Sequence, residues 1–510
     1  MKWSPVQTEA EKKVAAKLRK ASGFYRFLWE IRSELFDSEF QAELEKSYEP
    51  RGQEPCPPAL LAMVNLLQRY DGLSDADAVD AAENDRRWQL VLGCLDAEKA
   101  PFGQGTLVRF RTRAVANDLD KKLVDRTVEL AKKTGGFGWK SLRAALDSSP
   151  LHGAGRVEDT WNLIGRAMTK VVHAVSLALN LDEEAVIKGA RLSVLSANSI
   201  KSALDIDWDD DDAQTTALER LLTQVDALEQ WIAKRAAGAA DVPPLKEPLA
   251  MLRKLVAQDI EPDPTNGGRR IKQEVAKDRI ISVSDPEMRH GRKSKTKLFN
   301  GYKRHIALAN NLILATTVVP ANIQEHEAAT TLLERAAHHG AIEVVDIDRG
   351  YLSSDAIANL YREGVVINSK PWVPTNKGLF TKLDFDIDAR RRLVTCPNGK
   401  TARAVDSGKA SFAVDDCQRC KLKPSCTTSE SRSIALHPNE GMLVQLRRRK
   451  ATRAGRAELR KRVRVEHKLA RVASVQGDTA RYAGARKNEL DLNRTAAILN
   501  LQEVARTRAA

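Results

Sequence analysis

The segment from 279 to 369 constrains the fold most, because its apolar runs follow one another in a definite order. Three strand-like runs come first: "RIISVSD", "FNGYKRHIALAN" and "LILATTVVPAN". After them come a helix-like run, "EHEAATTLLERAAHHG", a buried strand, "AIEVVDID", a second helix, "SSDAIANLYREG", and a last strand, "VVINS". Strands followed by alternating helices and strands are typical of an α/β fold. One further strand, "SLRAALDSSPL", precedes this segment.

The other parts of the chain are expected to be mostly helical. Residues 1–135 have apolar residues at helical spacing, and Ser74 is expected to cap one of these helices. Residues 176–265 have the pattern of amphipathic helices. Residues 373–440 contain short strands and four cysteines, and residues 441–510 form basic helices.

Positive charge is concentrated in two segments of a chain whose formal net charge is +14. Residues 441–510 contain 18 Lys and Arg against 6 Asp and Glu, a net charge of +12. Residues 266–306 contain 12 against 4, a net charge of +8. Such a basic excess favours nucleic acid or an acidic membrane surface as a partner. No signal peptide and no apolar run of ~18 residues is visible, so nucleic acid is the expected partner and no membrane is involved.

Two aspartates are predicted at the ends of apolar strands. Asp147 follows "SLRAAL", and Asp348 ends "IEVVDID" just before Arg349, Gly350 and Tyr351. Open α/β sheets bind ligands in the crevice at the carboxyl ends of their strands, so both carboxylates are expected to face such a crevice. Either aspartate on its own would equally suit a helix N-cap.

A third carboxylate, Glu466, lies in the basic run "ELRKRVRVEHKLARV". On its own it would be interpreted as an ion-pair partner of Arg462. Together with Asp147 and Asp348 it gives three carboxylates from two strands and a helix. Phosphodiester cleavage without a covalent intermediate needs an activated nucleophile and a stabilised leaving oxygen, which two Mg²⁺ ions about 3.5–4 Å apart supply. The three residues therefore predict a site for two Mg²⁺ or Mn²⁺ ions.

Four of the six cysteines lie near one another in the sequence: Cys396, Cys417, Cys420 and Cys426. A local cluster in a long chain is more typical of a metal site than of a disulfide framework. Cys417 and Cys420 have the spacing of a zinc knuckle, so a structural Zn²⁺ is predicted. The other spacings are irregular, which leaves an iron–sulfur cluster or four reduced thiols as alternatives.

Several segments resemble one family, the bacterial insertion-sequence DDE transposases. They are "LDSSPLHGAGRVEDTWNLI", "SDPEMRHGRKSKTKLFNGYKRHIAL", "DIDRGYLSSDA" and "RVEHKLARV…RYAGARKN". The run "PALLAMVNLLQRYDGLSDADAV…LVRFRTR" resembles the domain that commonly precedes the catalytic domain of these proteins. The resemblance implies an RNase H-like catalytic domain with an Asp, Asp, Glu triad that binds Mg²⁺. The triad matches Asp147, Asp348 and Glu466, and the resemblance includes the cysteines.

The surroundings of Glu466 depart from the pattern of the family. Related transposases often have Tyr, Arg and Lys at positions −7, −4 and +7 from the glutamate. Arg462 stands at −4, where contact with a DNA phosphate is expected, but Leu459 and Ala473 occupy the other two positions. This departure leaves Glu458 as an alternative for the catalytic glutamate.

The basic segment "GRKSKTKLFNGYKRH" is interpreted as a surface that binds phosphate near the active site. The alternative is a solvated edge strand whose lysines protect it from pairing. Tyr302 and His305 match the "GYK-x-H" strand of the family. Two roles are open for these residues, packing and catalysis. The expected DNA-binding residues are Lys293, Lys295, Lys297, Lys303, Arg304 and Arg462.

The predicted fold class is α/β, with an RNase H-like mixed sheet, a helical N-terminal domain, a helical insertion and a Cys-rich β insertion. The expected domains are a helical DNA-binding domain (1–135), the first part of the core (136–175), the helical insertion (176–265), the second part of the core (266–372), a Cys-rich zinc-ribbon-like insertion (373–440) and basic helices with the catalytic glutamate (441–510).

The resemblance implies a DNA transposase that cleaves at the ends of an insertion sequence and transfers the strands into target DNA. The expected partners are double-stranded DNA, as inverted repeats and target, and a second copy of the chain in a homodimer on that DNA. The expected location is the bacterial cytoplasm, at the nucleoid. Two alternatives are a non-catalytic DNA-binding protein descended from a transposase and a metal-dependent nuclease that does not join DNA.

Overall fold

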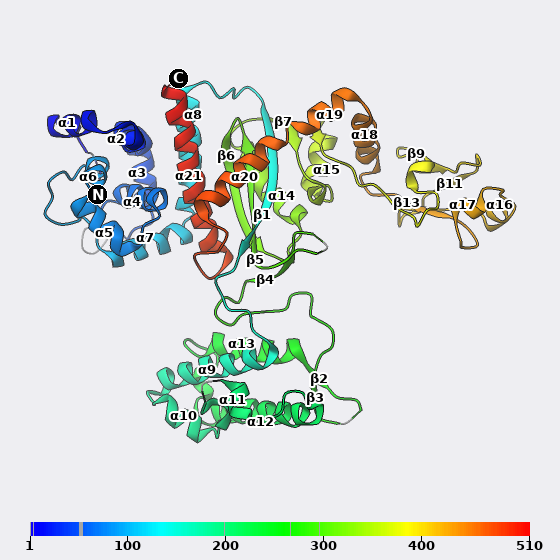
Figure 1. The fold of residues 1–510 in the computed structure, drawn as a ribbon, viewed down its shortest axis with the longest axis horizontal. Helices are drawn as coiled ribbons and strands as arrows, with labels where there is room; N and C mark the ends of the chain where they lie inside the picture. Colours follow the sequence, from blue (N-terminus) through cyan, green and yellow to red (C-terminus); the bar gives the residue numbers. More distant parts are fainter. Residues whose placement is uncertain are drawn as a thin grey trace.

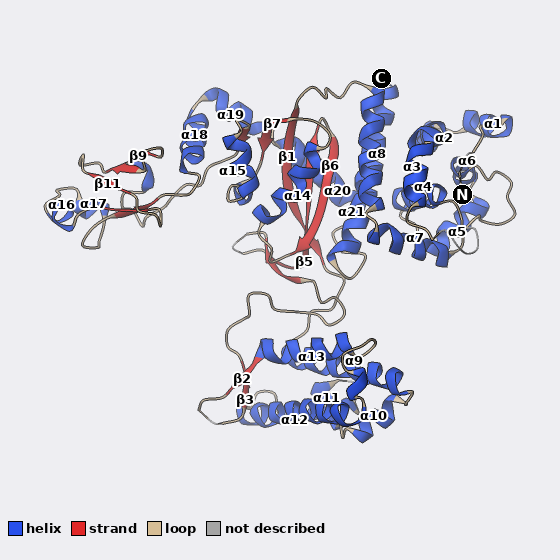
Figure 2. Ribbon diagram, turned by 180° about the vertical axis from the view of Figure 1, so that it is seen from behind, coloured by secondary structure: helices blue, strands red, loops and turns tan. Residues whose placement is uncertain are grey.

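The computed structural model describes residues 2–3, 5–49, 55–197, 199–265, 267–294 and 296–509. A curved mixed sheet lies at the centre, with the N-terminal helices on one side and a small β unit on the other. A helical lobe is attached to one end of the sheet by two chain segments (Figures 1 and 2). The predicted α/β class, with a mixed sheet and a helical N-terminal region, is confirmed. No helix in the described ranges is long and apolar enough to cross a membrane.

The central sheet contains six strands in the order β4-β5-β1-β7-β8, with β6 paired to β5. Strand β5 pairs with β1 and with β6 in antiparallel orientation, whereas β7 pairs with β1 and with β8 in parallel orientation. The strands are β1 (Leu142–His152), β4 (Arg289–Arg292), β5 (Leu298–Ala309), β6 (Leu312–Pro320), β7 (Ile342–Asp346) and β8 (Val366–Asn368).

A two-residue turn joins β5 and β6 into a hairpin. Asn310 and Asn311 both have positive φ, of 53° and 65°, and Ala309 pairs with Leu312 across the turn. Two positive φ values in such a turn match the right-handed twist of the flanking strands, and Asn tolerates this conformation. The hairpin gives β1 a long antiparallel partner, in which Ile306 lies opposite Asp147 and so fixes which face of the sheet each side chain takes.

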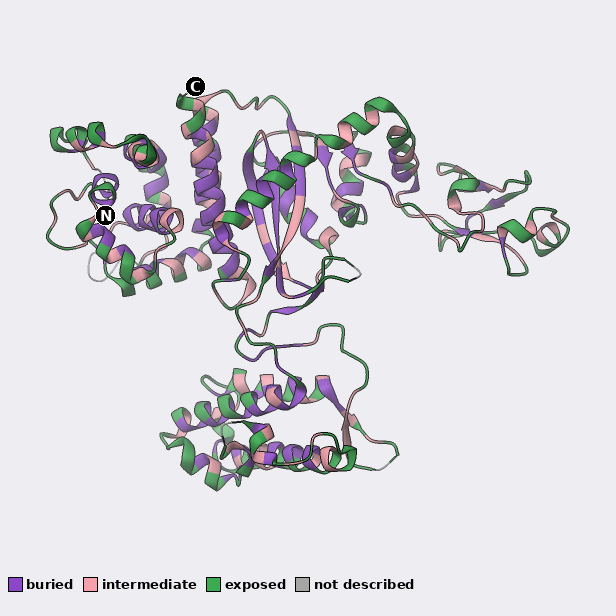
Figure 3. Ribbon diagram, in the orientation of Figure 1, coloured by how far each residue is buried: buried purple, intermediate pink, exposed green. Residues whose placement is uncertain are grey.

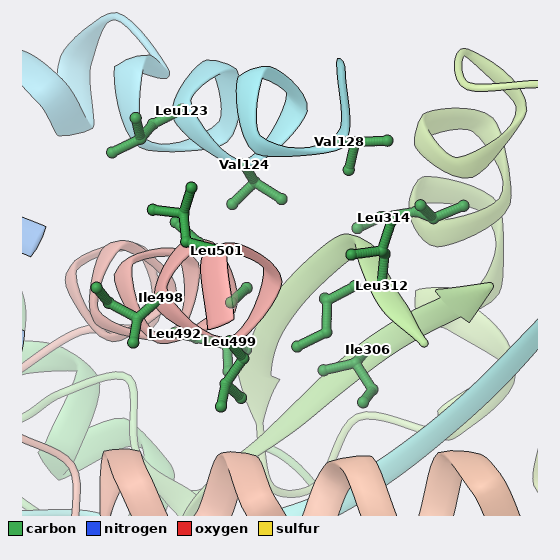
Figure 4. Packing of buried hydrophobic residues seen from close by; sticks show 14 of the residues in the cluster. Leu123, Val124, Val128, Ile306, Leu312, Leu314, Leu492, Ile498, Leu499 and Leu501 are labelled. Atoms are coloured by element: carbon green, nitrogen blue, oxygen red, sulfur yellow. The ribbon is translucent and has the colours of Figure 1, made fainter. Parts of the chain in front are cut away.

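The C-terminal helix α21 (Ala485–Ala509) is buried between the sheet and the N-terminal helices. It packs on β6 and also on α8 (Leu119–Thr134) and α4 (Pro58–Asp71). Figure 4 shows side chains of α8, α21, β5 and β6 meeting in this core. The Asn500 amide accepts from the Ile313 N–H at 2.8 Å and donates to its carbonyl at 2.9 Å. The N-terminal helices and the sheet therefore share one hydrophobic core.

The N-terminal region is helical, and Ser74 caps a helix as predicted. Its hydroxyl accepts a hydrogen bond from the Asp77 N–H at 3.2 Å, and the Asp77 carboxylate accepts one from the Ser74 N–H at 3.3 Å. This reciprocal pair is a capping box. The remaining helices of the region are α1 (Glu9–Lys17), α2 (Gly23–Leu35), α3 (Ser38–Glu45), α5 (Asp75–Asn84), α6 (Arg86–Leu92) and α7 (Gln104–Ala116).

The helical lobe has a hydrophobic core of its own. The first boundary expected for the insertion, at 176, falls inside α9 (Thr160–Leu179), whose buried apolar residues all belong to this core. Ile280 and Val283 belong to it as well, beyond the second expected boundary at 265. We therefore propose boundaries near 160 and 283. The other elements of the lobe are α10 (Glu183–Gly189), α11 (Ile200–Leu204), α12 (Asp211–Arg235), α13 (Lys246–Asp259), β2 (Ile260–Pro262) and β3 (Arg269–Ile271).

The run "RIISVSD" was expected to be a strand, but it forms none. Its apolar side chains are divided between two cores, since Ile281 packs in the central core and Ile280 in the core of the lobe. The Ile280 N–H donates to the side chain of Gln258 at 2.7 Å instead of to a neighbouring strand. The segment is thus one of the two connections between lobe and sheet, and β4 is the strand that follows it.

Beyond β8 the chain forms the small β unit and then the basic helices. The β unit has a third hydrophobic core, which includes Phe385, Val394 and Phe412. Figure 3 shows buried residues within each part and exposed residues around it. These elements are β9 (Asp386–Asp388), β10 (Leu393–Thr395), β11 (Thr401–Arg403), β12 (Lys409–Ser411), α16 (Val414–Gln418), α17 (Lys423–Cys426), β13 (Ser433–Ala435), α18 (Glu440–Ala451), α19 (Arg453–Arg460) and α20 (Val463–Gln476).

Candidate active site

Asp147 lies on β1 just beyond the point where that strand stops pairing with β7. The parallel pairing ends at Ala145 and Asp346. Asp147 does not end its strand, as had been expected, because β1 continues to His152 by pairing with β5. The side chain is only 13% exposed, and its Oδ1 accepts a hydrogen bond from the Ser148 N–H at 2.9 Å.

Asp348 lies two residues beyond the end of β7, at the same edge of the sheet. Its Oδ1 accepts a hydrogen bond from the Arg349 N–H at 2.8 Å, so it caps the short helix η4 (Arg349–Tyr351). Its side chain is nevertheless 47% exposed and lines the same cavity as Asp147. The capping role and a place in the site are therefore compatible.

Arg462 joins the two aspartates to Glu466. It immediately precedes α20, which packs on β1. Its guanidinium nitrogens lie 3.5 Å from Asp147 Oδ2, 3.2 Å from Asp348 Oδ1 and 3.2 Å from Glu466 Oε1. Three carboxylates that are far apart in the sequence thus surround one cation.

Glu458, the alternative glutamate, does not face this cluster. Its carboxylate pairs with Arg143 at 2.6 Å and with Lys461 at 2.6 Å. It lines a different cavity, between β7, β8 and the basic helices. Glu466 is therefore the glutamate that the helix register presents to the aspartates.

The carboxylate cluster carries more negative charge than Arg462 balances. Burial raises the pKa of Asp147 to about 6, and the charges of Asp348 and Glu466 add to this, against the opposing effects of Arg462 and the Ser148 N–H. Desolvation and nearby like charges both disfavour the ionised form of a carboxyl group. Further positive charge would therefore stabilise the ionised cluster.

A cavity of about 590 Å³ opens in front of the carboxylates, and basic side chains line it as well. Lys293 and Lys297 are exposed, in the connection between β4 and β5. Lys303 is half-buried, and its ammonium group donates to the Ile323 carbonyl at 2.8 Å. Lys295, predicted to belong to the same surface, lies outside the described residues. The cavity thus presents acidic groups for a cation next to basic groups for a polyanion.

Comparison with protein families identifies the kind of protein to which this site belongs. Residues 395–505, which include Arg462 and Glu466, match the family described as "Transposase DDE domain". Residues 16–113 match "Transposase domain (DUF772)". The two matches support a DDE transposase of the insertion-sequence type. Comparisons with curated proteins and with solved structures found no match.

The two matched ranges pack against each other in the transposase. The second contains α2 to α6, and the first contains most of α21, which packs on α4. Asp147 and Asp348 lie outside both ranges. Their assignment to the site rests on the resemblance of their motifs and on their geometry around Arg462.

Arg304 was expected to contact DNA, but the structure argues against this. Its side chain is only 1% exposed. Its guanidinium donates to Ser149 Oγ at 2.8 Å, to Gln476 Oε1 at 3.0 Å and to the Gly477 carbonyl at 2.7 Å. A guanidinium whose donors already have partners in the chain has little left to offer a phosphate. Arg304 instead ties β5 to β1 and to the end of α20.

Replacing Arg304 with Ala should therefore affect stability more than DNA binding. Loss of a buried side chain and its hydrogen bonds should lower the free energy of unfolding by about 2–4 kcal/mol. Chemical denaturation measures this, with Lys297→Ala as an exposed control expected to change stability by less than about 0.5 kcal/mol. A stable Arg304→Ala protein that binds DNA poorly would restore the original interpretation.

Tyr302 and His305 are buried in the sheet of the transposase, and their contacts indicate packing rather than catalysis. The Tyr302 hydroxyl donates to Asp285 Oδ1 at 2.5 Å and accepts from the Gly484 N–H at 3.1 Å. His305 Nδ1 lies 2.8 Å from the Tyr351 hydroxyl. Burial lowers the pKa of His305 to about 3, so its ring is neutral at pH 7.

The four cysteines of the β unit line one small cavity of about 30 Å³. The fold brings Cys396, which follows β10, to the other three. Burial raises the pKa of Cys426, and the charges of Cys417, Cys396 and Cys420 add to this effect, against that of Arg432. Among the described residues, however, no group of three or more His, Cys, Asp or Glu side chains could hold a metal ion as placed. The zinc site therefore stays a prediction.

Glu325, the first residue of α14 (Glu325–Ala337), also lies at the site, although it was not among the residues expected there. It lines the same cavity as the three carboxylates, and its Oε1 accepts a hydrogen bond from Ser148 Oγ at 2.6 Å. Acidic residues are common in the first turn of helices, where they complement the helix dipole. Nothing local in the sequence therefore distinguishes Glu325, and only the packing of α14 on the sheet reveals its position.

Proposed function

We propose that the transposase cleaves DNA at the ends of its insertion sequence and joins the freed ends to target DNA, with divalent cations held by Asp147, Asp348 and Glu466. The observation that carries this proposal is the convergence of the three carboxylates on Arg462 in a cavity lined with lysines. Carboxylate oxygens are the donors that Mg²⁺ and Mn²⁺ prefer. The donor set therefore fits these ions in kind, although among the described residues the carboxylates face Arg462 and no three such side chains are placed as a ligand set for a metal ion.

Bound Mg²⁺ would activate the attacking water or hydroxyl and stabilise the leaving oxygen. Lys293 and Lys297 bind phosphates of the DNA beside the carboxylates. Arg462 is placed to exchange its carboxylate partners for a DNA phosphate. Water first attacks a phosphodiester at the end of the element, and the freed 3′-hydroxyl then attacks a phosphodiester of the target. The same residues serve both steps, because each is an attack of an oxygen nucleophile on phosphorus.

The cavity itself weighs against a purely DNA-binding protein. Carboxylates repel phosphates, so a protein that only binds DNA gains nothing from three of them beside its lysines. A nuclease that cleaves without joining would use the same groups, and only the reaction products separate it from a transposase.

The test is incubation of the purified protein and Mg²⁺ with DNA that carries the inverted repeats of the element, together with a target plasmid. We expect breaks at the element ends and covalently joined products in the plasmid, both abolished by EDTA. Breaks without joined products would indicate a nuclease, and binding without breaks would indicate a DNA-binding protein.

We also propose that the transposase acts as a homodimer, so that two element ends are handled in one complex. Analytical ultracentrifugation with and without end DNA tests this. A complex that contains one protein chain and one DNA end would contradict the homodimer.

We further propose that Cys396, Cys417, Cys420 and Cys426 hold one structural Zn²⁺, with Zn–S distances of about 2.3 Å. Elemental analysis of the colourless purified protein should give one zinc per chain. Replacing Cys417 with Ser should remove it and destabilise the β unit, because its core is small. A brown protein with bound iron would instead indicate an iron–sulfur cluster, and a metal-free folded protein would indicate four reduced thiols.

A further inference from the structure

Glu325 is a fourth carboxylate at the cavity that contains Asp147, Asp348 and Glu466. It begins α14, a helix that packs on β5, β6 and β1. Its side chain is half-buried rather than solvated. The position is therefore set by the packing of a whole helix on the sheet, which is a firmer support than a loop would give.

Ser148 connects Glu325 to Asp147. The Ser148 hydroxyl donates to Glu325 Oε1 at 2.6 Å, while the Ser148 N–H donates to Asp147 Oδ1 at 2.9 Å. One residue thus holds both carboxylates, one through its side chain and one through its backbone. Burial raises the pKa of the Tyr351 hydroxyl, and the charges of Glu325 and Asp147 raise it further because Tyr351 lies near the same pair.

Gly350 provides the space that Glu325 occupies on the side of Asp348. A Cβ atom at Gly350 would lie 1.8 Å from Glu325 Oε2, a distance at which one of the two residues must move. Gly350 is the second residue after Asp348 in the "DRGY" motif. The Glu325 carboxylate therefore lies between the segments that follow the two aspartates.

Ordinary structural roles for Glu325 are weaker explanations. The capping box of α14 uses Gln324 and Glu327, so Glu325 is not the cap. Among the described residues Glu325 takes part in no ion pair within 4.0 Å, although its charge raises the pKa of Lys303 against the effect of burial. A half-buried carboxylate that forms no ion pair and lines the same cavity as three other carboxylates is well suited to bind a cation.

We propose that Glu325 is a fourth ligand of the divalent-cation site, a proposal that rests on the function proposed above. Glu325 adds a carboxylate from α14 to the same cavity, so cations held by Asp147 and Asp348 would meet oxygens from α14 as well as from α20. The Ser148 hydrogen bond orients the carboxylate, and Gly350 leaves it room.

The test measures Mn²⁺ binding to the full-length protein without DNA, by isothermal titration calorimetry. Glu325→Gln keeps an oxygen that accepts from Ser148 but removes the charge, so it separates a ligand from a mere hydrogen-bond acceptor. We expect it to weaken Mn²⁺ binding about 10-fold or more, and Glu325→Asp, which keeps the charge, to recover part of the loss. Glu334→Gln, an exposed position on the same helix, is the matched control and should bind Mn²⁺ as the unchanged protein does.

Asp147→Asn, measured in parallel, separates the failure of this proposal from failure of the proposed function. If Asp147→Asn weakens Mn²⁺ binding and Glu325→Gln does not, Glu325 is no ligand, while the triad site stands. If neither change affects Mn²⁺ binding, both proposals fall. Circular dichroism of each variant confirms that the fold is retained, and a Glu325→Gln protein that is folded and has lost affinity supports the assignment.

Discussion

Changing Asp147 or Asp348 to Ala is expected to abolish cleavage of element-end DNA and to leave DNA binding intact. The two carboxylates lie at one edge of the sheet and share the Arg462 guanidinium, at 3.5 and 3.2 Å. If each is a ligand of the catalytic cations, its loss removes several kcal/mol of transition-state stabilisation, which corresponds to a fall in rate of about 1,000-fold or more. Binding should be spared, because removing a carboxylate removes no contact with phosphate and leaves Arg462 freer to make one.

The measurement pairs single-turnover cleavage with gel-shift binding on the same DNA. Asp355→Ala is a suitable control, because Asp355 lies in the first turn of α15 (Asp355–Arg362) rather than at the cavity. Unchanged cleavage in both aspartate variants would contradict the proposed mechanism. Loss of DNA binding with the fold intact would indicate that the cations mainly anchor the DNA. The carboxylates would then have a role in DNA binding instead of catalysis.

The carboxylates could be found in the sequence because their local surroundings are informative. Asp147 and Asp348 follow runs of apolar residues that predict strands. When two such strands pair in parallel, the residues that follow them lie at the same edge of the sheet. Glu466 could be found only through the resemblance of its helix to the family, because an acidic residue among arginines otherwise indicates an ion pair. The structure shows that it does pair with Arg462, at 3.2 Å, so the two interpretations describe the same contact.

The remaining features depend on contacts between distant parts of the chain, and local patterns do not record those. Glu325 meets Ser148 only because α14 packs across the sheet. Arg304 belongs to a basic run, yet the fold buries it against Gln476 and Gly477. The apolar pattern at 279–285 predicts a buried strand, but the run forms no strand, and its apolar side chains are divided between two cores. In each case the partner in the fold could not be inferred from the local sequence.

The salt dependence of DNA binding should become less steep when Lys293 and Lys297 are both replaced with Ala. These side chains are exposed and line the cavity beside the carboxylates. A lysine that neutralises a phosphate releases condensed counterions, and each such contact contributes about −0.9 to the slope of log K against log salt. Loss of two contacts should therefore reduce the slope by about 1.8, while the free energy of unfolding changes little because both residues are exposed.

Fluorescence anisotropy over a series of salt concentrations measures this slope for the unchanged protein and for the double variant. Lys188 and Lys234, which are exposed on the helical lobe, provide a control pair with the same loss of charge. If the control pair flattens the slope as much as Lys293 and Lys297 do, the effect reflects net charge and not a local surface. If neither pair changes it, the lysines between β4 and β5 protect an edge strand from pairing, and the phosphates lie elsewhere, along the basic helices that carry Arg462. A selective effect of Lys293 and Lys297 would place the DNA backbone directly in front of the carboxylates, where the proposed chemistry requires it.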